Sequence, residues 1–406
     1  MQQKSYYNNL EDHFNEAVSL QQNGETEKAC KLYTQILDVM PDSPLVNYNM
    51  GTALFSIGKY HDAHRCYKKA LISAPEEVDL LYNLALCTKR LGLLRETIKY
   101  YKKILKLNHE DRESLYNLAC CYKDAGMDEN AISCYNELLQ TQPESEAVLN
   151  NLAYLYHKNE KYSDAVKMYV RLLKAHPDHH AAKHMLNSLS GEKCEAVPFQ
   201  YIKEIFDNYS SRYEKSLVSE LEYKVPLNLR RLFDATCSVP KKSMSVLDLG
   251  CGTGLGGEAF AELCKTATGV DISSNMIDLA SAKEIYSSLH VTEIHEYLEE
   301  CSNTFSLILA TDVLGYIGKL EKIFIKLFRV AEDGAFFCFS VEKGEENGYE
   351  LRTSGRFAHS FNYIQTLCDQ TGWQLEKHEI TALRRERDVW IEGMLFIVNK
   401  PATREN

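Results

Sequence analysis

The segment VLDLGCGTG, residues 246–254, has the residue types and spacing of a loop that holds a nucleoside-bearing cofactor. An apolar run ends at Asp248, and a glycine then stands at every second position. These glycines are Gly250, Gly252 and Gly254. Further along, a second apolar run ends at Asp271. Glycines let the backbone approach a ligand closely, and a carboxylate at the end of the second apolar run can bind both ribose hydroxyls.

Two classes of cofactor compete for this loop. The run from Gly252 to Gly257 fits the dinucleotide pattern G-x-G-x-x-G, which alone is weak evidence. S-adenosylmethionine is favoured because Asp248 precedes the first glycine by two residues, where a carboxylate can reach an amino-acid ammonium. The loop also carries no Lys or Arg for a phosphate, and Glu293 in HVTEI stands where a carboxylate can reach an adenine amino group. The remaining alternative is a strand, turn and helix without a ligand.

Several stretches of the chain resemble the class I S-adenosylmethionine-dependent methyltransferases. VLDLGCGTG is similar to their first motif, GVDISSNMIDLA (269–280) to the second, and FSLILATDVLGYIGKLEKIF (305–324) to the fourth-strand motif. FDNYSSRYEKSLV (206–218) resembles the lid that precedes this domain in many small-molecule methyltransferases. The resemblance covers residues 200–400 and implies methyl transfer from S-adenosylmethionine.

The resemblance also implies where the cofactor is held. Asp271 would bind the ribose, Tyr213 would lie over the cofactor, and Glu293 replaces the usual Asp beside adenine with a chain one methylene longer. Thr311 and Asp312 would face the methionine end. The full set expected to bind the cofactor is Tyr213, Asp248, Gly250, Cys251, Gly252, Thr253, Gly254, Asp271, Ile272, Met276, Glu293, Thr311 and Asp312.

The polar stretch ENGYELRTSGRFAHSFNYI, residues 346–364, is the candidate site for the methyl acceptor. Bacterial proteins that join repeats to a methyltransferase carry a similar stretch. Arg356 belongs to an arginine pair that can fix a carboxylate, and His359 can accept a proton, so both are predicted to be catalytic together with Tyr316. The alternative is a structural insertion whose polar groups bond to one another. A second basic group near the C-terminus is expected on the solvated surface, and comprises Arg384, Arg385 and Arg387.

The first half of the chain repeats with a period of 34 residues. The tyrosines that keep this period are Tyr33, Tyr67, Tyr101, Tyr135 and Tyr169. Glycine, alanine and proline recur at the same interval, which identifies tetratricopeptide repeats, each a pair of antiparallel helices. Five units are expected over residues 10–179, with a capping helix at 180–190.

One asparagine stands at the same place on the first helix of every unit. The positions are Asn15, Asn49, Asn83, Asn117 and Asn151. First helices line the concave face of such a superhelix, so these amides are predicted to bind a protein or peptide partner, because an amide both donates to and accepts from an extended backbone. The alternatives are that asparagine serves the fold here, or that the groove makes an intramolecular or oligomer contact.

Composition limits the class of protein. The 406 residues are 45% apolar and 25% charged with a net charge of −11, which disfavours DNA or RNA as substrate. The chain has no apolar run of 18 residues and no signal peptide, so we expect a cytoplasmic protein without a membrane span. The thirteen cysteines include no C-x-x-C pair and are expected as reduced thiols. His176, His180 and His184 stand four apart, but no metal site is expected because Pro177 interrupts their helix.

The expected architecture is α plus α/β. A repeat solenoid at 1–190 is followed by a linker at 191–199 and, at 200–406, a Rossmann-like, doubly wound class I methyltransferase domain with an N-terminal helical lid. We expect an enzyme whose repeats recruit a protein or carrier-bound substrate. Two alternatives remain open: methylation of a free small molecule, such as a carboxylate, with repeats used for assembly, and a scaffold that binds S-adenosylmethionine without turnover.

Overall fold

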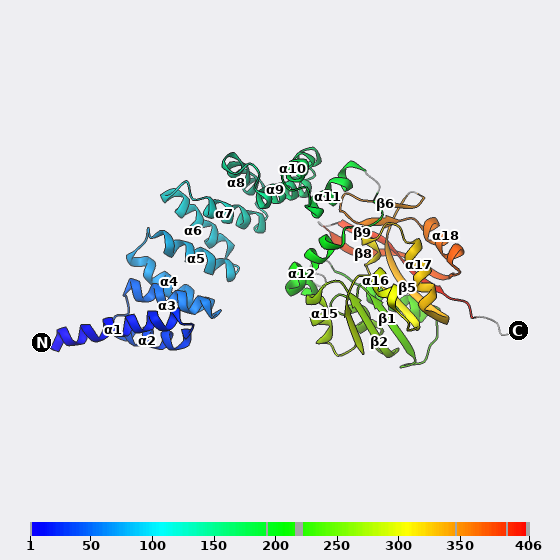
Figure 1. Ribbon diagram of the computed structural model, residues 1–406, viewed down its shortest axis with the longest axis horizontal. Helices are drawn as coiled ribbons and strands as arrows, with labels where there is room; N and C mark the ends of the chain where they lie inside the picture. Colours follow the sequence, from blue (N-terminus) through cyan, green and yellow to red (C-terminus); the bar gives the residue numbers. More distant parts are fainter. Residues whose placement is uncertain (1, 192–193, 216–221, 346, 387–388, 403–406) are drawn as a thin grey trace. The chain divides into compact units, whose positions relative to one another are not determined.

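The computed structural model divides the chain into two compact units, Met1–Pro177 and Asp178–Asn406, each described here by itself (Figure 1). The structure describes residues 2–191, 194–215, 222–345, 347–386 and 389–402. Side chains are described from residue 10 onward within these ranges, except those of 208–215.

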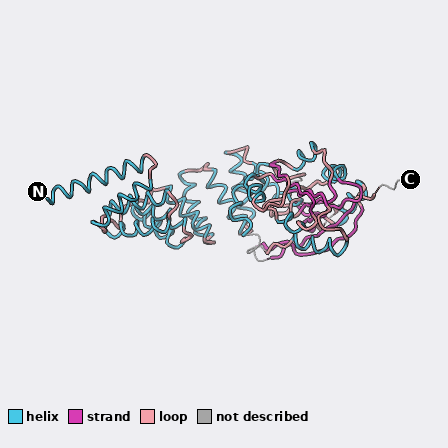
Figure 2. The backbone as a smooth tube through the Cα atoms, turned by 90° about the horizontal axis from the view of Figure 1, so that it is seen from below, coloured by secondary structure: helices cyan, strands magenta, loops and turns pink. Residues whose placement is uncertain are grey.

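The first unit is built from helices that follow one another in pairs, and Figure 2 shows only helix and loop in it. The bounds are α1 Gln2–Gln22, α2 Thr26–Val39, α3 Pro44–Ser56, α4 Tyr60–Ser73, α5 Val78–Arg90, α6 Leu94–Leu107, α7 Arg112–Asp124, α8 Asp128–Thr141, α9 Glu146–Lys158 and α10 Tyr162–Ala175. The 34-residue period of the sequence is therefore the period of these helix pairs, as predicted.

The recurring tyrosine fixes how closely the two helices of a pair approach. Tyr67 on α4 is 1% exposed, and its ring lies directly against Gly51 on α3. A Cβ at Gly51 would lie 2.7 Å from the ring, so only glycine fits there without a shift. Between the helices the chain turns through a left-handed residue such as Gly58, at φ +76°, which glycine adopts at little steric penalty. The repeat period, the turn within each helix pair and the packing of the two helices therefore depend on the same recurring tyrosine and glycine positions.

The second unit contains one sheet with helices on both faces. Its helices are α11 His180–Ser190, α12 Phe199–Lys215, α13 Val225–Thr236, α14 Leu255–Phe260, α15 Ser274–Ser281, α16 Ile294–Glu300, α17 Glu321–Val330 and α18 Phe361–Thr371, with a 3-10 turn, η2, at Leu314–Tyr316. Its strands are β1 Met244–Leu249, β2 Cys264–Asp271, β3 Ser288–Val291, β4 Phe305–Ala310, β5 Ala331–Lys343, β6 Tyr349–Leu351, β7 Phe357–His359, β8 Gln374–Glu386 and β9 Val389–Asn399.

Strands β3, β2, β1, β4 and β5 lie side by side in that order and are parallel. Beyond β5 the sheet continues with antiparallel β9 and then β8. The last residues of β5 also pair in parallel with β7, which forms a hairpin with β6. This is the predicted doubly wound, Rossmann-like arrangement, and it gathers the carboxyl ends of the central strands at one edge, where ligands of such sheets bind.

Alternate side chains of the central strands enter two separate cores. Leu247, Ile308 and Phe337 face the layer of α17 and α18. Val246 and Leu307 face the layer of α13 and α14. Because both faces are buried, the strands read as nearly continuous apolar runs in the sequence, as parallel strands do.

Three segments differ from what the sequence predicted. The polar stretch 346–364 contributes the β6–β7 hairpin and the start of α18. Strand β8, Gln374–Glu386, was not predicted from the sequence. The helix at 180–190 forms, but it falls in the second unit, where the His184 ring nitrogen Nε2 lies 2.8 Å from the Gly355 carbonyl oxygen. Its role as a cap of the repeats stays a prediction.

No helix in the described part of the chain has both the length and the apolar character that crossing a membrane requires.

Candidate functional site

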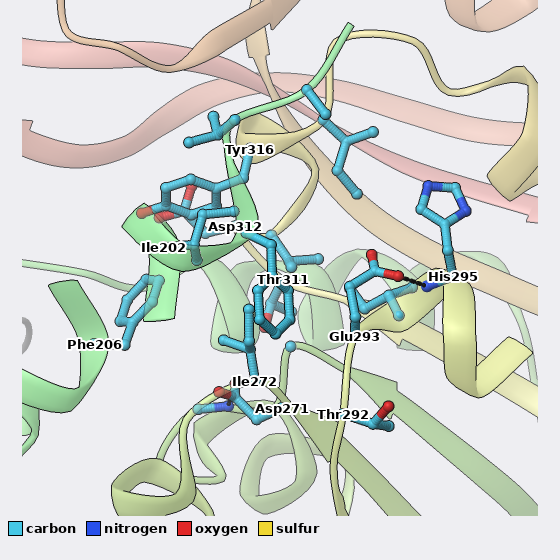
Figure 3. A pocket seen from close by; sticks show the side chains of 18 of the residues that line it. Ile202, Phe206, Asp271, Ile272, Thr292, Glu293, His295, Thr311, Asp312 and Tyr316 are labelled. Carbon is cyan, nitrogen blue, oxygen red and sulfur yellow. Dashed lines mark hydrogen bonds between the residues drawn. The ribbon is translucent and has the colours of Figure 1, made fainter. Parts of the chain in front are cut away.

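A cavity of about 280 Å³ opens at the carboxyl ends of β1, β2 and β4 (Figure 3). In Figure 3, Ile202, Phe206 and Tyr316 lie toward one side of it, and Glu293 and His295 toward the other. The residues that line it are Ala196, Val197, Phe199, Ile202, Phe206, Tyr223, Gly250, Gly252, Asp271, Ile272, Thr292, Glu293, Ile294, His295, Thr311, Asp312, Val313, Tyr316 and Ile317. Eight of the predicted site residues therefore meet in one place: Gly250, Gly252, Asp271, Ile272, Glu293, Thr311, Asp312 and Tyr316.

The glycine-rich loop after β1 needs its glycines for two different reasons. Gly250 has a left-handed φ of +60°, and a Cβ there would collide with the side chain of Val313. Gly252, at φ +53°, has no atom within 4 Å of its would-be Cβ, so its backbone borders open space in the cavity wall. The first glycine permits close packing and the second leaves room for a ligand.

Asp271 ends β2 and binds the glycine loop through backbone N–H groups. Its Oδ2 accepts from the Gly252 N–H at 2.8 Å, and its Oδ1 accepts from the Ser273 N–H at 2.9 Å. The carboxylate is 8% exposed, and its burial raises its pKa despite these bonds. Each carboxylate oxygen keeps a further lone pair, which is the acceptor capacity that a pair of ribose hydroxyls needs.

Asp248 lies behind the loop rather than in the cavity wall. The side chain is fully buried, and burial raises its pKa to about 7. Oδ2 accepts a hydrogen bond from the Tyr286 hydroxyl at 2.6 Å, whereas Oδ1 has no partner among the described residues. Asp248 is therefore not part of the cavity wall, and its expected contact with a ligand ammonium, directly or through water, stays a prediction. Tyr286 was not among the predicted site residues, because no motif in the sequence includes it.

Four more of the predicted cofactor residues are near the cavity without lining it. Cys251 and Thr253 are buried within the loop, and the Thr253 hydroxyl oxygen has no partner in the described part of the chain. Gly254 caps the start of α14, and Met276 is buried on α15. Tyr213 belongs to α12, but its side chain lies outside the described residues.

Glu293 lines the cavity but also has a structural task. Strand β3 ends two residues earlier, and Glu293 is the N-cap of α16. Its Oε2 accepts from the N–H groups of His295 at 2.8 Å and Glu296 at 3.1 Å. Among the described residues no backbone N–H donates to the other oxygen, Oε1, so Glu293 can cap the helix and still face a ligand.

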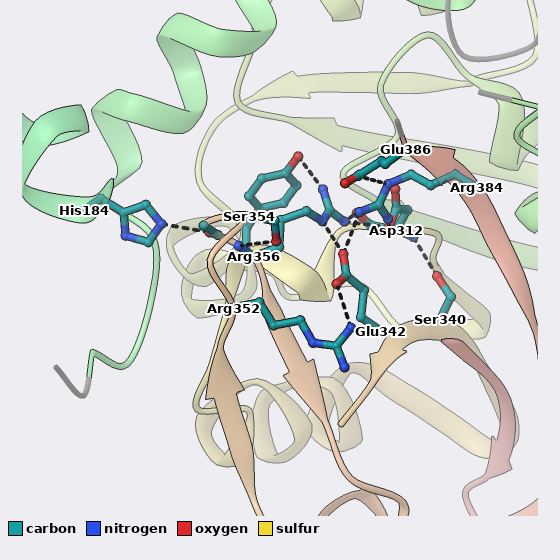
Figure 4. Close-up of polar contacts among 11 residues, drawn as sticks. His184, Asp312, Ser340, Glu342, Arg352, Ser354, Arg356, Arg384 and Glu386 are labelled. Atoms are coloured by element: carbon teal, nitrogen blue, oxygen red, sulfur yellow. Dashed lines mark hydrogen bonds and ion pairs between the residues drawn. The ribbon is translucent and has the colours of Figure 1, made fainter. Parts of the chain in front are cut away.

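A buried network of arginines and carboxylates surrounds Asp312, which lines the cavity (Figure 4). Arg356 donates from Nε to Glu342 at 2.8 Å, from Nη1 to the Tyr316 hydroxyl oxygen at 2.6 Å and from Nη2 to Asp312 Oδ1 at 2.6 Å. Its guanidinium also lies over the Tyr316 ring, 4.4 Å from the centroid. Arg356 thus acts on the cavity through Tyr316 and Asp312, and it does not itself line the cavity.

Arg384 completes the network, which corrects the prediction of a solvated basic surface. It is 3% exposed and donates to Glu342 at 2.6 Å, Asp312 at 3.1 Å and Glu386 at 2.7 Å. An irregularity in the β8–β9 register between Ala382 and Arg384 turns the side chain inward. Burial would raise the pKa of Glu342, but the two arginines outweigh burial and hold that pKa below its ordinary value. Arg385 is partly exposed, and Arg387 lies outside the described residues.

His359 is buried away from the cavity, which corrects its expected position at the reacting groups. It is 0% exposed, on β7, and its Nε2 lies 2.9 Å from the Gly318 carbonyl oxygen. The ring stacks on Tyr363, with centroids 5.8 Å apart. Burial lowers the pKa of His359 to about 4, so the ring is neutral at pH 7. The polar groups of this stretch largely bond within the fold, as the structural alternative anticipated.

The segment predicted as a linker contributes part of the cavity wall. Ala196 forms an isolated antiparallel bridge with Ile317, in which the Val197 N–H donates to the Tyr316 carbonyl oxygen at 2.9 Å. The Gly318 N–H donates in return to the Glu195 carbonyl oxygen at 2.8 Å. We call residues 194–198 the strap. The strap was missed because its role depends on a contact far along the chain.

The asparagine series makes bonds between successive repeats. Asn83 donates to the Tyr48 hydroxyl oxygen at 2.9 Å, and Asn117 to that of Tyr82 at 3.4 Å. Asn151 repeats the pattern with Tyr116 at 3.2 Å. Asn49 instead donates to its own helix at Leu45, and Asn15 is exposed. Part of the amide capacity therefore serves the fold.

Comparison with known proteins agrees with both units. The family described as a methyltransferase domain matches residues 247–339. The tetratricopeptide repeat family matches 48–111, and the family of the Psidin N-terminal repeat region matches 83–189. The chain therefore joins tetratricopeptide repeats to a methyltransferase domain.

Individual relatives cover only parts of the chain. The malonyl-[acyl-carrier protein] O-methyltransferase of Buchnera aphidicola is 36% identical over 102 residues, 24% of this chain and 40% of that protein. A ubiquinone biosynthesis O-methyltransferase of Pseudomonas fluorescens is 22% identical over 167 residues, 39% of this chain and 70% of that protein. Among solved structures, the repeat protein YrrB covers 42% of this chain and 89% of its own at 24% identity and a TM-score of 0.39. A SAM-dependent methyltransferase from Methanosarcina mazei covers 42% and 98% at 18% identity and a TM-score of 0.34.

S-adenosylmethionine is the cofactor of this methyltransferase domain, and the cavity fits it. Gly252 leaves open space beside the Asp271 carboxylate, as a ribose requires. Ile272 and Ile294 supply apolar walls near Glu293, which suits a flat base. The lining residues include no Lys or Arg that would mark a phosphate site.

Proposed function

We propose that this protein is an S-adenosylmethionine-dependent methyltransferase whose repeats recruit a protein or carrier-bound substrate. The observation that carries the enzymatic part is the cavity, which brings Gly252, Asp271 and Glu293 from three separate strand ends to one ligand-sized space. The cofactor, when bound, supplies a methyl group already activated by its positive sulfur. The protein then has to orient the acceptor and exclude water, and it needs no metal for this chemistry.

The recruiting role is supported by the fusion of repeats to the methyltransferase domain, since repeat solenoids offer extended binding surfaces. The relative named for malonyl-[acyl-carrier protein] supports a carrier-bound acceptor. Both curated relatives described above are named O-methyltransferases, which supports oxygen as the accepting atom.

The test is transfer of labelled methyl from S-adenosylmethionine to a macromolecular fraction of a cell lysate by the full chain. Asp271→Ala should weaken cofactor binding by about 1.5–3 kcal/mol, the scale of hydrogen bonds to a charged group, and should lower transfer. Absence of any labelled product, with the cofactor bound, would leave a scaffold without turnover as the better description.

Recruitment is tested separately with two double variants. Asn83→Ala with Asn117→Ala removes amides that we expect to face the partner, and should reduce labelling of the macromolecule with unchanged cofactor affinity. Tyr48→Phe with Tyr82→Phe removes the same bonds between repeats but keeps the amides. Equal losses in both double variants would mean that the asparagines act only through the fold.

A further inference from the structure

We propose that the methyl-accepting group is an uncharged hydroxyl on an apolar body, and that Tyr316 binds its oxygen. This inference rests on the methyltransferase function proposed above and deepens it. It concerns the side of the cavity formed by the strap, α12 and η2, where Figure 3 places Ile202, Phe206 and Tyr316.

First, the charged side chains on this side of the cavity decide which acceptor it can bind. Asp312 is the ionisable carboxylate on this side of the cavity, and the described lining residues contain no Lys or Arg. Asp312 Oδ1 is paired with both Arg356 and Arg384, so its negative charge is balanced from behind. This side of the cavity therefore favours neither a carboxylate nor an ammonium.

The second step is that the arginines are not available to an anion. All three nitrogens of Arg356 donate to Glu342, Tyr316 and Asp312. All three nitrogens of Arg384 donate within the network as well. An acceptor carboxylate would have to displace one of these partners and leave a buried carboxylate without its counter-charge, which is strongly unfavourable.

The third step is the hydrogen-bonding capacity of Tyr316. Its oxygen accepts from Arg356 at 2.6 Å, so the hydroxyl hydrogen cannot be directed at that donor. Within the described part of the chain no acceptor receives this hydrogen. Burial raises the pKa of Tyr316, which keeps the hydroxyl protonated. Tyr316 can therefore donate to the oxygen of an acceptor, and its second lone pair can accept from an acceptor hydroxyl.

The fourth step is the apolar surroundings of that hydroxyl. Ile202 and Phe206 are four residues apart on α12 and line the cavity together with Val197 and Ile317. The Phe206 ring stands edge-on to the Tyr316 ring, with centroids 5.6 Å apart and planes at 78°. The polar groups of Tyr316 and Asp312 are thus set among apolar walls, which favour a ligand with a small polar group on an apolar body.

With such an acceptor, the reaction is the transfer of a methyl group from sulfur to oxygen. The acceptor oxygen forms a bond to the methyl carbon while the methyl–sulfur bond breaks and its electron pair remains on sulfur. The hydroxyl proton is released to solvent. The products are a methyl ether and a neutral thioether.

The experiment is calorimetric titration of the full chain, saturated with S-adenosylhomocysteine, with three compounds that share one apolar body. These are 4-propylphenol, 4-propylbenzoate and 4-propylbenzylamine. We expect the phenol to bind at least tenfold more tightly than either charged compound. With S-adenosylhomocysteine bound, Tyr316→Phe should remove this preference. The matched control is Tyr349→Phe, whose ring packs on Phe357 outside the cavity wall and which should retain the preference.

The outcomes separate the two proposals. Failure of S-adenosylhomocysteine to bind would overturn the proposed function itself. With S-adenosylhomocysteine bound, equal or tighter binding of the carboxylate or the amine would overturn this inference and leave the function standing. Binding of none of the three compounds, or an unchanged phenol affinity in Tyr316→Phe, would also overturn it.

Discussion

At the scale of single residues, buried polar side chains decide the character of the site. Asp312 adopts a left-handed φ of +59°, which is unusual for a residue other than glycine and tolerated best by Asp and Asn. Its N–H donates to the Ser340 hydroxyl at 2.8 Å, and its carboxylate is fixed by two arginines. The surrounding contacts therefore hold a conformation that the isolated residue would rarely adopt, and they set the position of the cavity wall.

His359 makes the free energy of unfolding depend on pH, although the residue does not line the cavity. Its pKa is about 4 in the folded chain and close to 6.5 when unfolded. Between these values the unfolded chain binds a proton that the folded chain does not, so stability falls as the pH falls from 6.5 to 4. The loss amounts to about 3 kcal/mol at 1.36 kcal/mol for each pKa unit.

The measurement is the urea midpoint of unfolding from pH 7.5 to pH 4.5 for the natural chain and for His359→Gln. Gln keeps a donor for the Gly318 carbonyl and does not titrate. We expect the difference between the two curves to grow as the pH falls below 6.5. Parallel curves over the whole range would show that His359 is protonated equally in both states.

At the scale of elements, the sequence was a good guide to which helices and strands form. It was a poorer guide to the contacts that these elements make with one another. The glycine loop, Asp271 and the helix pairs are local patterns, so period and spacing were sufficient to place them. Arg384 was placed wrongly because its burial depends on the register irregularity in β8, a strand that was not predicted from the sequence. His359 was misplaced for a related reason, since only pairing of β7 with β5 shows that its short strand is buried on all sides.

Helix α12 was predicted as a lid, and its contacts with the cavity allow a sharp test. Ile202 and Phe206 line the cavity, whereas Glu204 between them is exposed. Ile202→Ala removes three carbons, so at about 0.8 kcal/mol for each buried methylene it should weaken S-adenosylmethionine binding by up to about 60-fold. Phe206→Ala should act in the same direction, and Glu204→Ala should have no effect in calorimetric titration. An unchanged affinity in both cavity variants would exclude α12 from the closed site.

At the scale of the whole molecule, the chain consists of two compact units with separate cores. The repeats are stabilised by contacts between neighbouring helices, and the second unit by the two faces of its sheet. A ligand that binds one folded unit stabilises that unit by mass action. The two units should therefore respond differently to the cofactor.

Differential scanning calorimetry of the full chain should show two transitions. Cofactor at a hundredfold excess over its dissociation constant stabilises the unit that binds it by about 2.7 kcal/mol, and only that transition should move upward. Asp271→Ala, with binding weakened by about 1.5–3 kcal/mol, should reduce this stabilisation to about 0.3–1.3 kcal/mol at the same cofactor concentration. A single transition that moved as a whole would show that the two units unfold together.

The strap has a consequence for the inheritance of this architecture. Residues 194–198 follow the segment where the repeats end, yet their backbone is hydrogen-bonded to the loop that carries Tyr316. A recombination event, deletion or change of length within 191–199 would therefore alter the pocket wall and not merely the spacing of two modules. We therefore expect repeats to be exchanged more readily at a junction upstream of the strap than at one within it.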